Sequence, residues 1–236
     1  MDADVLVVGA GPAGSTTAYL LACQGWDVLL VDRARFPRSK TCGDGLTPRA
    51  VATLQRLGLL PQLLAAGYPR IEGARLVAPD GHEWRLRFAD HLHELPGYGL
   101  VVPRLELDEW LRQHAMAAGV RFLGGFRVQK PLCQDGRVAG VQGRLNGRVQ
   151  SIRARLTVVA TGVSIGLLRA LGVMKRMPPV VRAARAYFAG VEGLDRDFEF
   201  HFRLTPMPGY GWIFPGPGGQ ANVGVGLFPL LSLIHI

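Results

Sequence analysis

Residues 3–32 read ADVLVVGAGPAGSTTAYLLACQGWDVLLVD, and this stretch decides the fold class. The apolar run of residues 3–8 predicts a strand, residues 13–24 an amphipathic helix, and residues 28–31 a second strand that ends in Asp32. A glycine-rich turn joins the first strand to the helix. This order of strand, turn, helix and strand predicts a βαβ unit with parallel strands.

The turn between the first strand and the helix fits the pattern GxGxxG. Gly9 permits a tight turn, Gly11 lets the backbone approach a pyrophosphate, and Gly14 lets the helix pack closely on the strand. Pro12 and Ala13 open the helix, whose free N–H groups and positive dipole end then face an anion. The sequence therefore predicts a dinucleotide site.

Asp32 stands at the end of the second strand, where a carboxylate accepts hydrogen bonds from ribose hydroxyls. FAD and NAD proteins share this first unit, so the motif does not choose between them. The remaining chain favours FAD, because the crossover to the strand of residues 156–160 is a predicted β-meander, residues 126–152, with hairpin turns at Asp135-Gly136 and Asn146-Gly147. No second GxGxxG lies between a strand and a helix.

Other local signals organise the remaining chain. Thr47 predicts an N-cap, Pro48 the first helical position, and Gly58 the end of that helix. Residues 71–88 predict a hairpin and residues 105–118 a further helix. After Pro178-Pro179 the pattern predicts strands alone, at residues 183–189, 198–204, 210–214 and 221–227.

These elements predict an α/β chain, α+β overall. It combines a Rossmann-like dinucleotide-binding domain that has a β-meander crossover with part of an antiparallel β-sheet substrate domain. The expected boundaries are residues 1–70 and 98–177 for the first domain, 71–97 for a hairpin insertion that belongs to the second, and 178–236 for the remainder of the second. The apolar tail, residues 228–236, ends without polar residues, so we expect a fragment or a tail foreign to the parent protein.

Composition excludes several classes of protein. The chain has 236 residues and a net charge of +9, but its arginines are spread along the sequence, which favours a solvated basic surface over a nucleic-acid-binding face. Its three cysteines are far apart, and His91 and His93 lack a nearby third ligand, so no disulfide framework and no metal site are predicted. No signal peptide and no membrane span are recognisable, so we expect a cytoplasmic protein.

Three segments of the chain are distinctive when taken together. The first is the βαβ unit with Arg33, which is generic to FAD proteins. The second is the loop RSKTCGDGL, residues 38–46, followed by Pro48-Arg49-Ala50. The third is PGYGWIFP, residues 208–215, followed by ANVGVG, residues 221–226. With these segments the chain resembles the geranylgeranyl reductase family, which consists of FAD-dependent oxidoreductases with the p-hydroxybenzoate hydroxylase fold. The resemblance covers nearly the whole chain, up to about Leu227.

The resemblance assigns roles to individual residues. It implies that Asp32 and Arg33 bind the ribose, that Arg104 contacts the flavin dinucleotide, and that the loop from Cys42 through Gly43 and Asp44 to Gly45 lies beside the isoalloxazine ring. It implies that the substrate cavity has an aromatic wall, made by Tyr210, Trp212 and Phe214. From the pattern alone, ordinary strand packing is the favoured interpretation of these alternating aromatic residues.

The chain departs from the family at two points. Thr161-Gly162 stands where relatives commonly have Asp-Gly, and the later Gly-Asp segment that binds the ribityl and pyrophosphate groups is missing, since the only Gly-Asp pair is Gly43-Asp44. The resemblance thus predicts a C-terminally truncated relative that holds half of a cofactor site, with Thr161 and Gly162 in that half.

The activity implied by the resemblance is the reduction of carbon–carbon double bonds in an isoprenoid substrate by reduced FAD, with NAD(P)H or another reductant as electron donor. Cys42, Asp44 and Tyr210 are the candidate catalytic residues. The alternatives are an FAD-dependent monooxygenase of an aromatic or polyketide substrate, and a non-catalytic fragment. A lipid-like substrate and an arginine-rich surface favour peripheral contact with the inner face of a membrane. Which isoprenoid is reduced, the electron donor and the oligomeric state stay open.

Overall fold

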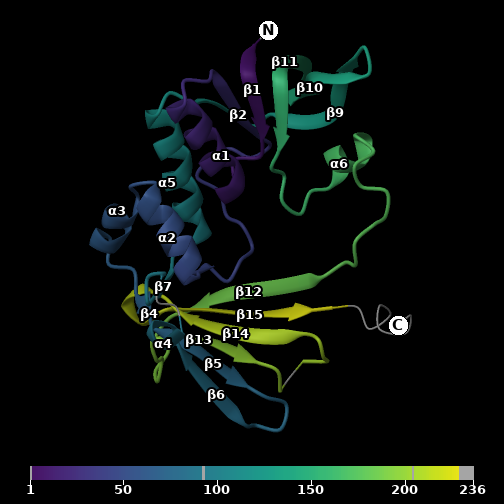
Figure 1. The fold of residues 1–236 in the computed structure, drawn as a ribbon. Helices are drawn as coiled ribbons and strands as arrows, with labels where there is room; N and C mark the ends of the chain where they lie inside the picture. Colours follow the sequence, from purple (N-terminus) through teal and green to yellow (C-terminus); the bar gives the residue numbers. More distant parts are fainter. Residues whose placement is uncertain (1, 92–93, 204, 229–236) are drawn as a thin grey trace. The chain divides into compact units, whose positions relative to one another are not determined.

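Strand β1 (Ala3–Val8) lies inside a mixed sheet in the computed structural model, which describes residues 2–91, 94–203 and 205–228. In that described part the sheet has six strands in the order β8-β2-β1-β11-β10-β9 (Figure 1). Neighbours among β8, β2, β1 and β11 run parallel, and β11, β10 and β9 form an antiparallel meander. The strands are β2 (Val28–Asp32), β8 (Arg121–Gly124), β9 (Arg127–Gln134), β10 (Arg137–Leu145) and β11 (Arg148–Val159).

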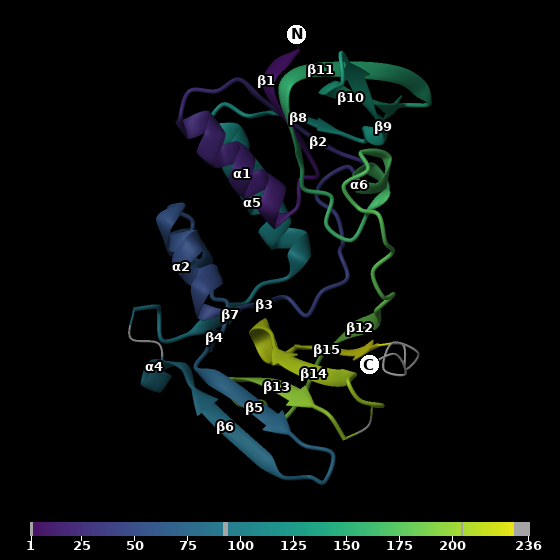
Figure 2. The same cartoon turned by 45° about the vertical axis from the view of Figure 1, so that its right-hand side comes forward.

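Both faces of β1 are buried, because its alternating side chains enter two different hydrophobic clusters. Val5 and Val7 pack with Ala18 of helix α1 (Pro12–Cys23) and Ala115 of helix α5 (Arg104–Ala117). Figure 2 shows these two helices together on one side of the sheet. The intervening Leu6 and Val8 pack on the opposite side with residues of the meander and of helix α6 (Gly166–Ala170). A continuous apolar run is typical of such a doubly covered strand.

The meander differs from the expectation in one respect. Residues 156–160 were expected as a separate buried strand, but the third meander strand and this run form the single strand β11. Its first half pairs with β10 and its second half with β1, so one strand serves both neighbours. Leu156 is 55% exposed, and it lines a surface pocket together with Val5 and Trp26.

The second sheet carries the aromatic residues. Its six strands, counted in the described residues, have the order β12-β15-β14-β13-β5-β6. Neighbours are antiparallel except β13 and β5, which run parallel. The strands are β5 (Gly73–Val77), β6 (Glu83–Arg87), β12 (Arg182–Phe188), β13 (Asp197–His201), β14 (Tyr210–Pro215) and β15 (Ala221–Leu227).

Short elements accompany this second sheet. Helix α2 (Pro48–Arg56) begins as expected, with the Thr47 hydroxyl accepting a 3.4 Å hydrogen bond from the Ala50 N–H. A small sheet in the order β3-β7-β4 lies among the same residues. The remaining elements are β3 (Gly45–Leu46), α3 (Leu60–Ala65), β4 (Arg70–Ile71), α4 (Phe88–His91), β7 (Gly99–Val101) and the 3-10 helix η1 (Pro217–Gly219).

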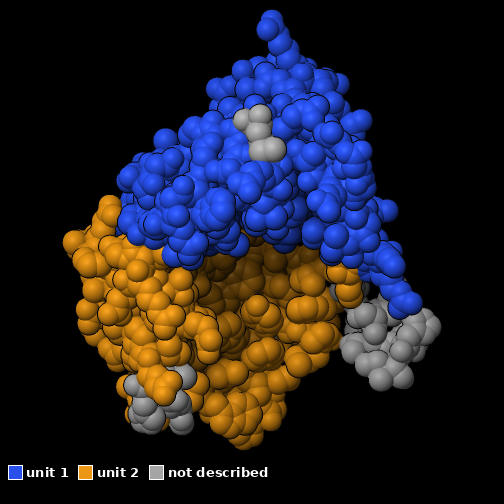
Figure 3. All heavy atoms as spheres, turned by 45° about the horizontal axis from the view of Figure 1, so that its top comes forward, with its two compact units in different colours: residues 1–39, 105–177 blue, residues 40–104, 178–236 orange. Residues whose placement is uncertain are grey.

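The contacts divide the chain into two compact units, which Figure 3 colours separately. Unit 1 comprises residues 1–39 and 105–177, and unit 2 comprises residues 40–104 and 178–236. The sequence interpretation placed residues 40–70 and 98–104 in the first domain instead. They fall in unit 2 because Ile71 and Val101, at the small sheet, pack into the aromatic cluster of β13 and β14. The apolar tail beyond Phe228 lies outside the described residues.

Candidate functional site

The glycine motif that follows β1 has room only for glycine at two of its positions. Gly9 has a φ of +107°, and a Cβ atom there would lie 2.3 Å from the carbonyl oxygen of Ala160. A Cβ atom on Gly14 would lie 1.7 Å from the carbonyl oxygen of Gly9. Both distances are far below van der Waals contact. The glycines of the predicted motif therefore let α1 approach β1 and β11 this closely.

The N-terminus of α1 is left open toward a ligand. Gly11 is its N-cap and is extended, Pro12 is the first helical residue, and no side chain among the described residues caps the helix. Its first turn contains no acidic residue. The N–H groups of Ala13 and Gly14 thus lie in the first turn, where helix N–H groups lack intrahelical acceptors and favour an anion.

Asp32 binds the glycine turn directly. Its Oδ2 accepts a 2.8 Å hydrogen bond from the Ala10 N–H, and its Oδ1 accepts one of 2.8 Å from the Ala34 N–H. The carboxylate is half-buried. Each carboxylate oxygen has a further lone pair, so ribose hydroxyls can still bind to it.

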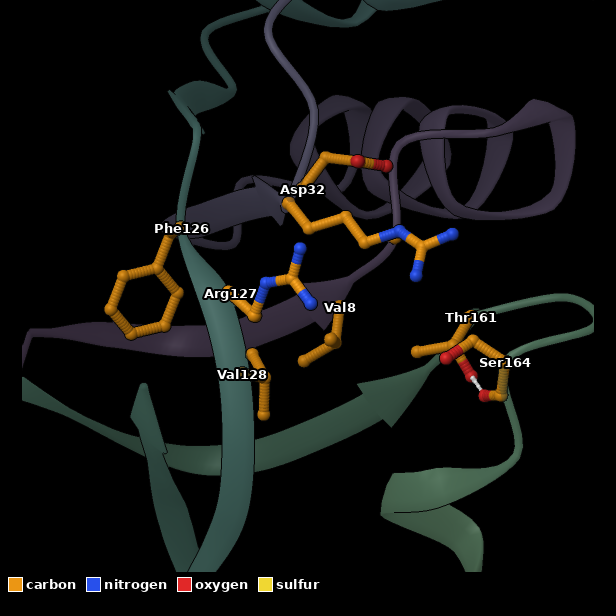
Figure 4. Close-up of a pocket in the computed structure, with 9 residues that line it drawn as sticks. Val8, Asp32, Phe126, Arg127, Val128, Thr161 and Ser164 are labelled. Atoms are coloured by element: carbon orange, nitrogen blue, oxygen red, sulfur yellow. Dashed lines mark hydrogen bonds between the residues drawn. The ribbon is translucent and has the colours of Figure 1, made fainter. Parts of the chain in front are cut away.

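A cavity of about 180 Å³ in unit 1 lies beside this turn (Figure 4). Figure 4 shows Asp32 of β2, Arg127 of β9 and Thr161 of the segment after β11 around one opening. The Thr161 hydroxyl donates a 2.6 Å hydrogen bond to the Ser164 carbonyl oxygen, which holds this segment in a tight turn. The lining residues are Val8, Gly9, Asp32, Arg33, Phe126, Arg127, Val128, Thr161 and Ser164.

The structure thus places Gly9, Asp32, Arg33 and Thr161, four of the residues assigned to the cofactor by the sequence analysis, around one cavity. Arg33 and Arg127 outnumber the single acidic lining residue, so the cavity attracts anionic ligands. Phe126, Arg127, Val128 and Ser164 were not anticipated. The first three lie at the start of the predicted meander, and Ser164 follows the Thr161-Gly162 turn. No sequence motif distinguishes these four residues from other strand and loop residues.

Unit 2 contains the loop of the CGDG motif. Asp44 is the most buried residue of this loop, with 1% of its surface exposed. Its Oδ2 accepts hydrogen bonds of 2.5 Å from the Tyr187 hydroxyl and 2.7 Å from the Asn222 amide nitrogen. Its Oδ1 accepts one of 3.2 Å from the Arg104 N–H. The same Asn222 amide donates a 2.9 Å hydrogen bond to the Cys42 carbonyl oxygen. Burial, and then the bond to Asp44, raise the pKa of Tyr187 above its ordinary value.

The loop backbone lies against the aromatic side chains of β13 and β14. A Cβ atom on Gly43 would lie 2.8 Å from the ring of Phe214 and 3.1 Å from Nε1 of Trp212. A Cβ atom on Gly45 would lie 3.0 Å from the ring of Phe198. Larger residues at these positions would therefore push the loop away from the sheet.

The predicted aromatic wall consists of residues with different exposure. Trp212 and Phe214 are 7% and 8% exposed, and both belong to the buried cluster beneath the loop, whereas Tyr210 is half-buried beside it. The Trp212 indole donates a 3.0 Å hydrogen bond to the side-chain oxygen of Asn222. Trp212 and Phe214 thus support the loop, and Tyr210 is the more accessible of the three.

Sequence reasoning missed Tyr187 and Asn222. Asn222 did leave a signal, because it is a polar residue in the otherwise apolar strand of residues 221–227. Tyr187 left none, since a tyrosine in a strand is common. Arg104, expected at the flavin, begins α5, and its N–H group contacts Asp44. No group of His, Cys, Asp or Glu side chains suited to a metal ion occurs within the described residues.

A βαβ unit with a glycine cradle and a carboxylate at the second strand defines a dinucleotide-binding protein. Residues 2–192 match the family described as FAD binding domain, and the chain belongs to this family.

The curated relatives include proteins named as menaquinone reductase and as digeranylgeranylglycerophospholipid reductase. The chain is 40% identical over 233 residues to the menaquinone reductase of Mycobacterium tuberculosis, an alignment that covers 95% of this chain and 55% of that protein. It is 34% identical over 233 residues to digeranylgeranylglycerophospholipid reductase 2 of Methanopyrus kandleri, covering 96% and 55%. The chain therefore spans about half the length of the curated relatives it matches.

A solved structure has the same fold. The geranylgeranyl bacteriochlorophyll reductase-like protein of Thermoplasma acidophilum superposes with a TM-score of 0.83 at 26% identity, over 99% of this chain and 58% of that one. No helix in the described ranges is long and apolar enough to cross a membrane.

Proposed function

We propose that the chain is the flavin- and loop-bearing part of an FAD-dependent oxidoreductase that reduces carbon–carbon double bonds of an isoprenoid substrate. The observation that carries this proposal is the CGDG loop, which Asn222 holds by hydrogen bonds against the aromatic side chains of β13 and β14. Membership of the FAD binding domain family and 40% identity to a menaquinone reductase support it.

The residues of unit 1 fit the dinucleotide part of FAD. Close packing at Gly9 and Gly14 makes the cradle, the first turn of α1 offers N–H groups to the pyrophosphate, and Asp32 accepts ribose hydroxyls. Arg33 adds positive charge at the ribose. When bound and reduced by the electron donor, the flavin would supply the hydride for the reduction.

Residues of unit 2 bind and orient the substrate in this proposal. An isolated alkene is a poor hydride acceptor, so the protein has to exclude water and align the apolar chain. Tyr210 offers an accessible ring for that contact, and Cys42 lies in the loop above Trp212 and Phe214. We propose Cys42 and Tyr210 as the residues nearest to the reacting atoms, with Arg104 as a contact of the flavin dinucleotide.

The reductant and the location are part of the same proposal. We propose that NAD(P)H or another donor reduces the flavin. A net charge of +9 and a lipid-like substrate support peripheral attachment to the cytoplasmic face of an anionic membrane. Sedimentation with anionic vesicles at low salt tests the attachment, and failure to sediment contradicts it.

Cofactor binding is tested first. The purified chain is incubated with FAD, desalted and examined by visible absorption. A retained flavin spectrum is expected, and it should be lost in Gly14→Ala. A colourless wild-type chain would favour the alternative of a fragment that lacks a sufficient cofactor site.

The reaction is tested anaerobically with menaquinone and with a geranylgeranyl lipid, using dithionite-reduced protein and mass spectrometry. The assay includes a chimera in which the remaining C-terminal part of the Mycobacterium tuberculosis menaquinone reductase follows Leu227. We expect a product that has gained two hydrogens per reduced bond, and a loss of turnover in Cys42→Ala. Oxygen consumption coupled to hydroxylation of an aromatic substrate would instead establish the monooxygenase.

A further inference from the structure

We propose that Tyr187 and Asn222 form a clamp that positions the Cys42 loop, and that Asp44 is a positioning residue within this clamp rather than a proton donor. For its effect on turnover, the inference rests on the proposed function. The position and reactivity of the Cys42 thiol can be measured without FAD or substrate.

The clamp comes from two neighbouring strands. Tyr187 of β12 and Asn222 of β15 are directly opposite each other in the antiparallel register, so their side chains share one face of the sheet. The Tyr187 hydroxyl and the Asn222 amide converge on the same oxygen of Asp44. Both strands thus hold a loop that lies far earlier in the chain: Asp44 is 143 residues from Tyr187 and 178 residues from Asn222.

Two further contacts hold the loop backbone, at the carbonyl oxygens of Lys40 and Cys42. The Asn222 amide donates to the Cys42 carbonyl oxygen at 2.9 Å, and the Arg185 guanidinium approaches the Lys40 carbonyl oxygen at 3.5 Å. The Arg185 guanidinium also lies 4.1 Å from the centre of the Tyr187 ring, which steadies the tyrosine. The backbone from Lys40 to Cys42 is thus held to the sheet at both of its ends.

The backbone of Asp44 has a left-handed conformation and is hydrogen bonded to a neighbouring segment. Its φ is +65°, in the left-handed region that residues other than glycine seldom adopt. The N–H of Val102 donates a 3.0 Å hydrogen bond to its carbonyl oxygen, so the backbone of Asp44 is held as well as its side chain. Contacts to both its side chain and its carbonyl oxygen therefore hold Asp44 in this conformation.

The hydrogen bonds of Asp44 show why we assign it to positioning. A hydroxyl, an amide and a backbone N–H donate to the two carboxylate oxygens, so the group acts as an acceptor throughout. Tyr187 keeps its proton over an extended alkaline range, because its pKa is raised, and it remains a donor to Asp44 there.

The test measures how fast iodoacetamide alkylates Cys42. Cys23 and Cys133 are exposed, so both are first replaced by serine, which leaves Cys42 as the only thiol. In this background, Tyr187→Phe and Asn222→Ala each remove a hydrogen bond to Asp44. Neither new side chain is larger than the one it replaces. Tyr98→Phe, also in unit 2, is the matched control for the tyrosine.

We expect alkylation to become about five- to tenfold faster in Tyr187→Phe and in Asn222→Ala, as the loss of one to two hydrogen bonds frees the loop. Tyr98→Phe should leave the rate unchanged. An unchanged or slower rate in both clamp variants, with thermal unfolding that confirms a folded protein, would overturn the proposal.

Substitutions of Asp44 distinguish a positioning role from a role as proton donor. Asp44→Asn keeps a carbonyl oxygen as an acceptor, whereas Asp44→Ala keeps none, so a positioning role predicts slow alkylation in Asp44→Asn and fast alkylation in Asp44→Ala. The chimera described above should then retain most of its turnover in Asp44→Asn. Abolished turnover together with wild-type alkylation in Asp44→Asn would overturn the assignment and make Asp44 an acid. If no variant of the chimera, wild type included, turns over, the proposed function fails while the alkylation rates still decide the clamp.

Discussion

Oδ2 of Asp32 accepts a 2.8 Å hydrogen bond from the backbone N–H of Ala10, across a separation of 22 residues. The carboxylate that the motif assigns to a ribose therefore also ties the end of β2 to the glycine turn. Its other oxygen accepts from the Ala34 N–H, which fixes the start of the following loop. The side chain that we propose as a ribose ligand thus also joins two segments of the fold.

Asp32→Ala should weaken both FAD binding and the fold. The N–H groups of Ala10 and Ala34 would lose their acceptor, at a cost of about 1–3 kcal/mol in the free energy of unfolding. Asp32→Asn keeps one acceptor oxygen and should lie between the wild type and the alanine variant. Flavin fluorescence titration and urea unfolding measure the two effects. Wild-type FAD affinity in Asp32→Ala would contradict the assignment.

Gly14→Ala should disrupt the cradle, because its Cβ atom would lie 1.7 Å from the Gly9 carbonyl oxygen. We expect a loss of about 1–3 kcal/mol or more in unfolding free energy, as in overpacked cores, together with loss of bound FAD. Gly166→Ala is the control in the same unit, since nothing lies within 4 Å of its added Cβ atom. At the start of α6 it should be neutral or stabilise by up to about 1 kcal/mol. Equal stability of the two variants would count against the close packing at Gly14.

Gly224→Ala should displace Trp212, because the new Cβ atom would lie 2.1 Å from Cζ2 of its indole. The Trp212 hydrogen bond to Asn222 would break, and the buried indole would become exposed. Tryptophan emission should shift to longer wavelength, and the free energy of unfolding should fall by about 1–3 kcal/mol. Gly226→Ala, on the same strand and with nothing within 4 Å, should change neither quantity. An unshifted spectrum in Gly224→Ala would show that the ring is not held there.

Tyr187 should ionise later than an ordinary tyrosine when the pH rises. Burial disfavours its phenolate, and its bond to Asp44 favours the protonated form, so the pKa is raised in the folded state. Its contribution to stability is therefore complete below the pKa of an unfolded tyrosine, about 10, and is lost as the pH rises through the folded-state pKa. Ultraviolet titration of the wild type minus Tyr187→Phe isolates this group. A difference spectrum that titrates near 10 would refute the shift.

Much of unit 1 was predictable because its signals are local. GxGxxG, the apolar runs of β1 and β2, and the turn residues Asp135 and Asn146, both left-handed in the structure, each act within a few residues. The extent of β11 was not predictable from local pattern. It depends on which neighbours a strand finds, and β11 finds β10 along one half and β1 along the other.

The sequence by itself determined the βαβ unit, the glycine cradle and the carboxylate at the end of β2, because strand, turn and helix preferences are carried by neighbouring residues. Only the tertiary structure decided that Asp44 lies under Tyr187 and Asn222, and that Trp212 and Phe214 support the loop. Those contacts join residues far apart in the chain. They exist because sheet register brings side chains of β12, β14 and β15 to one face, where a buried carboxylate requires hydrogen-bond donors.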